Sequence, residues 1–108
     1  MQQRDYLERL IALIAGFLAK ILGLARGGQF EEADREIDNA WAALGFRRND
    51  AHRLDDATLR LMLGPKLTLA LRLFEAEATV HEGRGSQPLA DMLRARITRL
   101  SDESADAE

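Results

Sequence analysis

The chain has 108 residues, of which 46% are hydrophobic and 31% are charged, and it contains no cysteine. This length suits one ordinary domain with a single core, and the lack of cysteine excludes disulfides, thiolate nucleophiles and cysteine-based metal sites. A formal net charge of −3 disfavours nonspecific binding to nucleic acid. We expect a cytoplasmic protein, because a cysteine-free chain fits a reducing compartment.

The choice of apolar residues predicts an all-α fold. Leucine and alanine dominate, whereas valine and tyrosine, which favour strands, occur once each, at Val80 and Tyr6. The apolar spacing predicts four main helices and one short helix, in a single helical domain over residues 1–100. The acidic tail, residues 101–108, has no large hydrophobic side chain, and we expect it to be disordered.

The first predicted helix spans residues 5–26 and carries two apolar stripes on adjacent faces. One stripe contains Leu7, Ile11, Ile14, Leu18, Ile21 and Ala25, and the other contains Leu10, Leu13, Phe17 and Leu24. One stripe would be enough for a helix on the outside of a small core. Two stripes indicate that this helix is central or that it also contacts something outside its own chain.

The second predicted helix follows a turn at Gly27-Gly28, begins at Gln29 or Phe30 and ends at Gly45. Its predicted core face contains Phe30, Ala33, Ile37, Ala40, Trp41 and Leu44. The next segment, residues 46–54, has no apolar period, so we predict an exposed loop there.

Asp55 or Asp56 is a suitable N-cap for a short helix that ends at Leu63, and Gly64-Pro65 then interrupts the chain. The following helix is predicted from Lys66 to about His81. It too has two stripes, formed by Leu67, Ala70, Leu71, Phe74 and Ala78 and by Leu69, Leu73, Ala76 and Val80.

The last predicted helix follows a flexible turn at residues 82–87. Ser86 can cap it, and Pro88 suits its first turn. Its inward face would contain Ala90, Leu93, Ile97 and Leu100.

Residues around the first turn resemble a tetratricopeptide hairpin. The turn glycine, the aromatic residue, the first alanine, the large hydrophobe and the second alanine of that repeat correspond to Gly28, Phe30, Ala33, Ile37 and Ala40. Lys20 departs from the pattern, because a leucine is usual there. A partial second copy contains Phe74, Gly85 and Ala90, so the resemblance implies two helical hairpins.

The opening stretch "QRDYLERLIALIAGFLAKILGL", with "GQFEEADREIDNA" behind it, also resembles a bacterial family of short helical proteins of unknown function. This resemblance supports the extent of the domain and implies no catalytic residues.

Two sets of polar residues could form a chemical site. Glu77 and His81 have the spacing of two metal ligands on one helix, but no His-Glu-x-x-His pattern accompanies them, so we interpret them as an exposed i, i+4 pair. His52 lies near Asp55 and Asp56, as a general base would, but no nucleophile accompanies it and helix capping explains the aspartates. We therefore predict no catalytic residue, no metal, no cofactor and no enzymatic activity.

Charged residues suggest further contacts. Arg47 and Arg48 could contact phosphate, although a solvated loop is the simpler interpretation. The last helix and the turn before it carry basic residues, and the second helix is acidic. The basic residues are Arg84, Arg94, Arg96 and Arg99, and the acidic ones are Glu31, Glu32, Asp34, Glu36 and Asp38. Either these are two solvated faces, or they meet between neighbouring subunits.

The uncharged run at residues 10–19 could belong to a signal peptide or contact a membrane. It is too short to span a bilayer, and the charges before it sum to zero where a signal peptide would be positive. We expect neither nucleic acid nor a membrane as a partner.

The two helices with second stripes predict a non-catalytic protein–protein interaction module that self-associates, most simply as a homodimer. The predicted interface contains Leu10, Leu13, Phe17, Leu69 and Leu73. The alternative is a small-molecule-binding regulatory module with a pocket between the hairpins, lined by Trp41 and Phe74, although aromatic residues at helical spacing more often belong to the core.

Overall fold

The computed structural model describes the backbone of residues 2–106 and the side chains of residues 4–102. Four long helices form its body: α1 (Gln2–Arg26), α2 (Phe30–Ala43), α5 (Leu67–Gly83) and α6 (Gln87–Asp106). Between α2 and α5 lie two short helices, α3 (Arg48–Arg53) and α4 (Asp56–Leu63), and a 3-10 turn, η1 (Gly64–Lys66). The part of the chain that the structure describes contains no strand, which confirms the all-α prediction.

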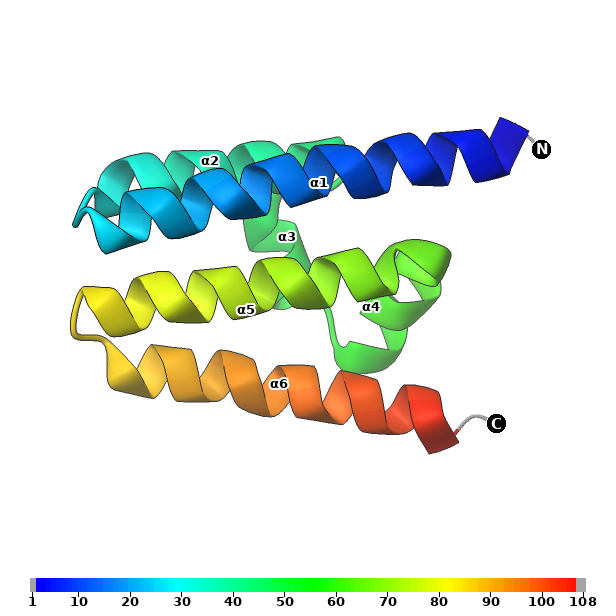
Figure 1. The fold of residues 1–108 in the computed structure, drawn as a ribbon. Helices are drawn as coiled ribbons and strands as arrows, with labels where there is room; N and C mark the ends of the chain where they lie inside the picture. The colour runs from blue at the N-terminus through cyan, green and yellow to red at the C-terminus, as the bar shows by residue number, and fades with distance from the viewer. Residues whose placement is uncertain (1, 107–108) are drawn as a thin grey trace.

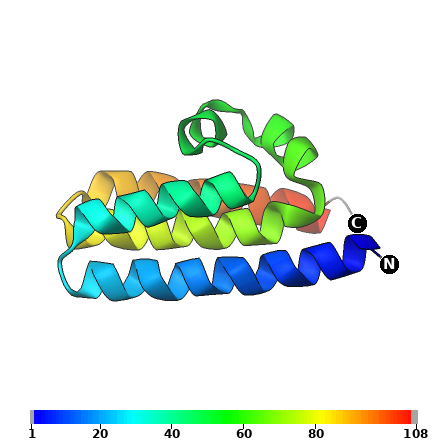
Figure 2. The ribbon, with the colours of Figure 1, turned by 90° about the horizontal axis from the view of Figure 1, so that it is seen from above.

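The four long helices form two antiparallel hairpins, α1 with α2 and α5 with α6 (Figure 1). Helix α5 is central, because it packs against both helices of the first hairpin as well as against α6. Helices α3 and α4 lie together on one side of the long helices (Figure 2). The two predicted hairpins are therefore present, and their likeness to tetratricopeptide units stays a prediction.

Most predicted helix boundaries agree with the structure. Asp55 caps α4 by accepting a hydrogen bond from the backbone N–H of Thr58 at 3.2 Å. The first turn closes where Gly28 adopts a positive φ of 75°, a conformation that costs glycine little because it has no Cβ.

Two segments differ from the predictions. Residues 48–53 form α3 instead of an exposed loop, and Ala51 is the buried residue of this helix. A six-residue helix with one buried side chain has no apolar period that a sequence pattern could show. The backbone of α6 continues through Asp106, beyond the predicted domain end at residue 100. The disordered tail stays a prediction, and residues 107–108 lie outside the described residues.

The core is centred on α5. Trp41 and Phe74, the pocket residues of the alternative prediction, are fully buried and pack on each other with ring centroids 5.2 Å apart. Leu69 and Leu73 are also buried, because neighbouring helices cover both stripes of α5. The prediction that this helix presents a surplus apolar face is therefore wrong for these two residues.

Arg96 of α6 is a buried cation that holds α3 and α4 against the body. Its guanidinium donates hydrogen bonds to the carboxylate of Asp56 at 2.9 Å, to the carbonyl of Ala51 at 3.1 Å and to the carbonyl of Leu54. It also lies over the ring of Phe74, 5.4 Å from the centroid. These contacts satisfy two carbonyls at the end of α3, which has few apolar contacts of its own.

We predict that Arg96→Lys lowers the free energy of unfolding by about 2 kcal/mol, because an ammonium cannot reproduce the planar, multidentate contacts of a buried guanidinium. Arg99→Lys is the matched control, since Arg99 also binds Asp56, at 2.8 Å, but its side chain is largely exposed. Urea denaturation of both variants measures the difference. Equal effects would show that Arg96 has no special role.

Candidate functional site

A cleft of about 1010 Å³ lies between the two hairpins. Helix α3 forms one wall with Arg48 and His52, and α5 supplies Glu77 and His81. The opposite wall is α6, whose Leu89, Met92 and Leu93 are apolar. A pocket between the hairpins is the predicted alternative, but neither Trp41 nor Phe74 lines this cleft.

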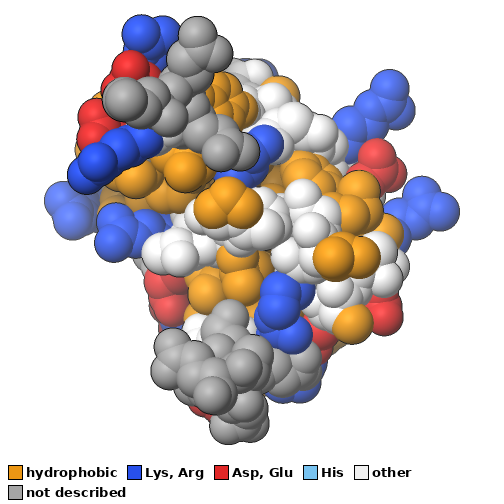
Figure 3. All heavy atoms as spheres, turned by 90° about the vertical axis from the view of Figure 1, so that its right-hand side faces the viewer, with side chains coloured by type: hydrophobic (Ala, Val, Ile, Leu, Met, Phe, Trp, Pro, Cys, Tyr) orange, Lys and Arg blue, Asp and Glu red, His pale blue; other side chains and the backbone are white. Residues whose placement is uncertain are grey.

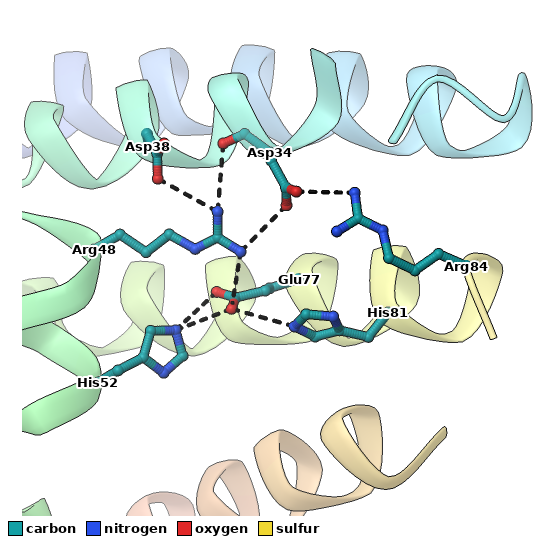
Figure 4. A network of polar contacts seen from close by, with 7 residues as sticks. All are labelled: Asp34, Asp38, Arg48, His52, Glu77, His81 and Arg84. Carbon is teal, nitrogen blue, oxygen red and sulfur yellow. Dashed lines mark hydrogen bonds and ion pairs between the residues drawn. The ribbon is translucent and has the colours of Figure 1, made fainter. Parts of the chain in front are cut away.

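The carboxylate of Glu77 is the centre of the polar network beside this cleft (Figure 4). Only 3% of the residue is exposed, although it is charged. Its oxygens lie 3.1 Å from Arg48 Nη2, 3.0 and 3.1 Å from His52 Nε2, and 3.5 Å from His81 Nε2. Three side chains from two helices therefore surround one buried carboxylate.

Arg48 joins this carboxylate to α2. Its guanidinium lies 3.3 Å from carboxylate oxygens of both Asp34 and Asp38, and Asp34 also binds Arg84 at 2.9 Å. Figure 4 shows Arg48 reaching between α2 and α5, with His52 one turn further along α3. The network thus links α2, α3 and α5.

The electrostatics keep Glu77 ionised. Burial by itself would raise the pKa of this carboxyl, but the hydrogen bond from His52 and the charge of Arg48 outweigh burial and lower it below its ordinary value of 4.5. Burial would likewise lower the pKa of Arg48, and the carboxylates of Glu77, Asp34 and Asp38 raise it instead. The buried charges are therefore compensated by their neighbours.

The orientation of His52 and His81 determines which ring nitrogen of each faces Glu77. Each directs Nε2 toward Glu77, so a neutral ring that donates from Nε2 has Nδ1 as an acceptor. Nδ1 of His81 is buried and has no hydrogen-bond partner among the residues that the structure describes. Arg48 lies against the same carboxylate, and no group of three or more candidate metal ligands is found among the described residues.

One interpretation of the polar residues is wrong. Glu77 and His81 are not an exposed pair, because α3 covers Glu77. His52 contacts Glu77 and not Asp55 or Asp56. Asp56 binds Arg99 and Arg96, and mainly the hydrogen bond from Arg99 lowers its pKa despite partial burial.

Many residues of the predicted charged faces pair within the chain. In α6, Arg94 contacts Glu75 at 2.9 Å and Glu82 at 2.5 Å. In α2, Glu36 contacts Lys20 of α1 at 3.3 Å. These pairs leave less unpaired charge for a contact between subunits than the sequence suggested.

The predicted interface residues of α1 divide between core and surface. Leu10 is buried and Phe17 is partly buried, whereas Leu13 is 50% exposed. Ile11 on the other flank is also 50% exposed, and the residues between these flanks are small and exposed. We call this surface the outer face of α1, formed by Ile11, Ala12, Leu13, Ala15, Gly16 and Ala19.

Other exposed apolar side chains lie on α4, where Leu61 is 83% exposed and Met62 is 58% exposed. Figure 3 views the end of the molecule where the N-terminus of α1 and the C-terminus of α6 lie, and hydrophobic side chains appear there between positive ones. This mixed surface lacks the continuous uncharged stretch of the outer face of α1.

Comparison of the chain with protein-family models, with curated proteins and with solved structures found no match to any of them. The described helices include none that is long and apolar enough to cross a membrane. The function must therefore be argued from the two features just described, the cleft and the outer face of α1.

We predict that Glu77→Gln lowers the free energy of unfolding by about 2 kcal/mol at neutral pH, because it removes a charge that compensates buried Arg48. Since the pKa of Glu77 is lowered by folding, its charge stabilises the fold above pH 4.5, and this contribution is lost as the pH falls through the lowered value. The difference between wild type and variant should therefore narrow in acid. Urea denaturation at several pH values measures it.

The matched control is Glu75→Gln, one half-turn away on the same helix, where the side chain is 53% exposed and pairs with Arg94 at the surface. It should have little effect on stability. If Glu77→Gln were equally mild, the network would not hold α3 in place.

Proposed function

We propose that the protein is a non-catalytic interaction module that self-associates as a homodimer through the outer face of α1. The observation that supports this is the continuous exposed apolar surface on a helix whose other side already packs against α2 and α5. Monomeric proteins seldom leave such surfaces in water, and a contact with a second copy would cover it.

Two glycines in α1 support the same proposal. A Cβ added at Gly16 or Gly23 would meet no atom within 4 Å beyond the adjoining backbone of α1, so packing against the rest of the chain does not require glycine there. Glycine inside a helix costs about 1 kcal/mol relative to alanine. Close packing of a second helix would offset this cost, because small residues let two helix backbones approach each other.

The size of the surface indicates the strength of the contact. One helix face is smaller than the interface of about 800 Å² per partner that stable complexes bury. We therefore expect a dissociation constant of about 1 μM or weaker, unless neighbouring helices contribute to the contact. Sedimentation equilibrium over a wide dilution series covers this range.

We predict that Leu13→Glu and Ala15→Glu each weaken the dimer about tenfold or more, because both place a charge in an apolar contact. Ala15 is exposed in the single chain, so Ala15→Glu should leave the thermal unfolding of dilute, monomeric protein unchanged. Sedimentation equilibrium measures association, and circular dichroism checks the fold.

Ala95→Glu is the matched control, since Ala95 is an exposed alanine in the interior of α6. It should not change association. A wild-type chain that stays monomeric at high concentration would contradict the proposal, and so would a dimer that tolerates both α1 substitutions.

We also propose a second candidate function, the binding of a small amphipathic carboxylate in the cleft. The supporting observation is the combination of apolar and basic groups along the cleft: Leu89 and Met92 are exposed on α6, and basic side chains lie on the rim. Arg47 and Arg53 are exposed on the rim, where they could attract an anionic group.

For this function we predict that millimolar octanoate raises the unfolding temperature by a few degrees, since a ligand that binds only the folded chain stabilises it. Met92→Glu should abolish the shift by placing a negative charge in the cleft. Leu61→Glu, on an exposed leucine outside the cleft, should retain it. No shift with octanoate or across a library of metabolites would count against a ligand.

A further inference from the structure

We infer that two copies of the chain pair through antiparallel α1 helices, with the two-fold axis near Phe17. This inference rests on the proposed self-association and goes beyond it by fixing the direction and register of the contact. The occupant of the outer face of α1 is then the same face of a second copy. The charges along α1 and the spacing of its residues carry the argument.

The charges on α1 favour the antiparallel direction. The acidic residues of this helix, Asp5 and Glu8, lie near its N-terminus beside two arginines, one of which, Arg4, is 3.9 Å from Glu8. In the C-terminal half, Lys20 pairs with Glu36 of α2, and Arg26 is an exposed basic residue. A parallel pair would place Arg26 at the same level as its own copy, and Glu8 at the level of its own copy, so like charges would lie close together. An antiparallel pair brings the carboxylates of one helix to the basic end of the other, and it also opposes the helix dipoles.

The spacing of two of these residues fixes the register. Glu8 and Arg26 are separated by about five full turns of an α-helix, so their side chains leave α1 on the same side. A two-fold axis perpendicular to the helices keeps each flank against the same flank of the partner. When the axis passes midway between these residues, at position 17, Glu8 lies opposite Arg26 of the partner subunit.

The same axis also matches the small residues. Ala15 and Ala19 are equally far from position 17, so each lies opposite the other residue in the partner subunit. Ala12 lies within one residue of the level of the partner's Gly23, and Gly16 lies next to the axis. The line of contact between the two helices therefore consists of small residues along its length. Ile11 and Leu13, on its two flanks, can pack over its sides.

The chain has no cysteine of its own, so single introduced cysteines report the register directly. In the antiparallel pair, Gly16 is about 3 Å along the axis from its own copy, whereas Gly23 is about 18 Å from its own copy. A disulfide needs Cα atoms within about 7 Å. A cysteine at either glycine would displace nothing outside its own turn of α1, because no atom beyond the adjoining helix backbone lies within 4 Å of the position its Cβ would take.

We therefore expect Gly16→Cys to form a disulfide-linked dimer under mild oxidation about tenfold faster than Gly23→Cys. A mixture of Ala12→Cys and Gly23→Cys should form the mixed dimer at a rate close to that of Gly16→Cys. In denaturing urea these differences should disappear. If Gly23→Cys instead links to itself as fast as Gly16→Cys, the pair is parallel and the inference is wrong.

A charge exchange tests the register independently. Glu8→Arg and Arg26→Glu should each weaken the dimer about three- to fivefold, because each creates two like-charge contacts, and the double variant should restore it. Failure of the double variant to restore association would contradict the register. A dimer in sedimentation that forms none of the disulfides would overturn the α1 pairing and leave self-association standing, whereas a monomer would overturn both.

Discussion

The buried carboxylate of Glu77 is the constraint on which the arrangement of the short helices depends. It lies in the middle of α5, which α1, α2 and α6 surround, and an isolated charge in such a place would be costly. Arg48 and His52 remove that cost, and both come from α3. The position of α3 is thus set by electrostatic compensation more than by apolar packing, since Ala51 is its buried residue.

This way of holding α3 also creates the cleft. A helix packed by large apolar side chains would lie flat on its neighbours, whereas long side chains such as Arg48 and Arg96 connect α3 to the body across a gap. Arg96 and Glu77 support α3 in different ways: Arg96 binds the carbonyls at its C-terminus, and Glu77 binds the side chains of Arg48 in its first turn and His52 in its last turn. Removing either side of this support should affect α3 before the four long helices, whose apolar contacts are separate.

The four long helices can be predicted from the sequence because apolar residues recur at helical spacing and glycines mark the turns. The role of the second apolar stripe on α1 and on α5 cannot be predicted from the sequence. Both helices have the same pattern, and they differ only in how many helices surround them. The polar network escapes prediction for a related reason: the spacing of Glu77 and His81 describes one helix, and their partners lie on α3. One signal is present, since Glu77 has Ala76 and Ala78 as neighbours and Leu73 and Val80 one turn away on either side, an unusually apolar setting for a carboxylate.

The outer face of α1 and the cleft can serve different ends in the same molecule. Among the described side chains, those that line the cleft come from other segments than α1, and the polar network engages α2, α3 and α5. Pairing of two copies through α1 would therefore not place the contacting helices over either cleft. Helix α5 packs against α1 and also supplies Glu77 and His81 to the cleft, so it is the element that connects the two surfaces.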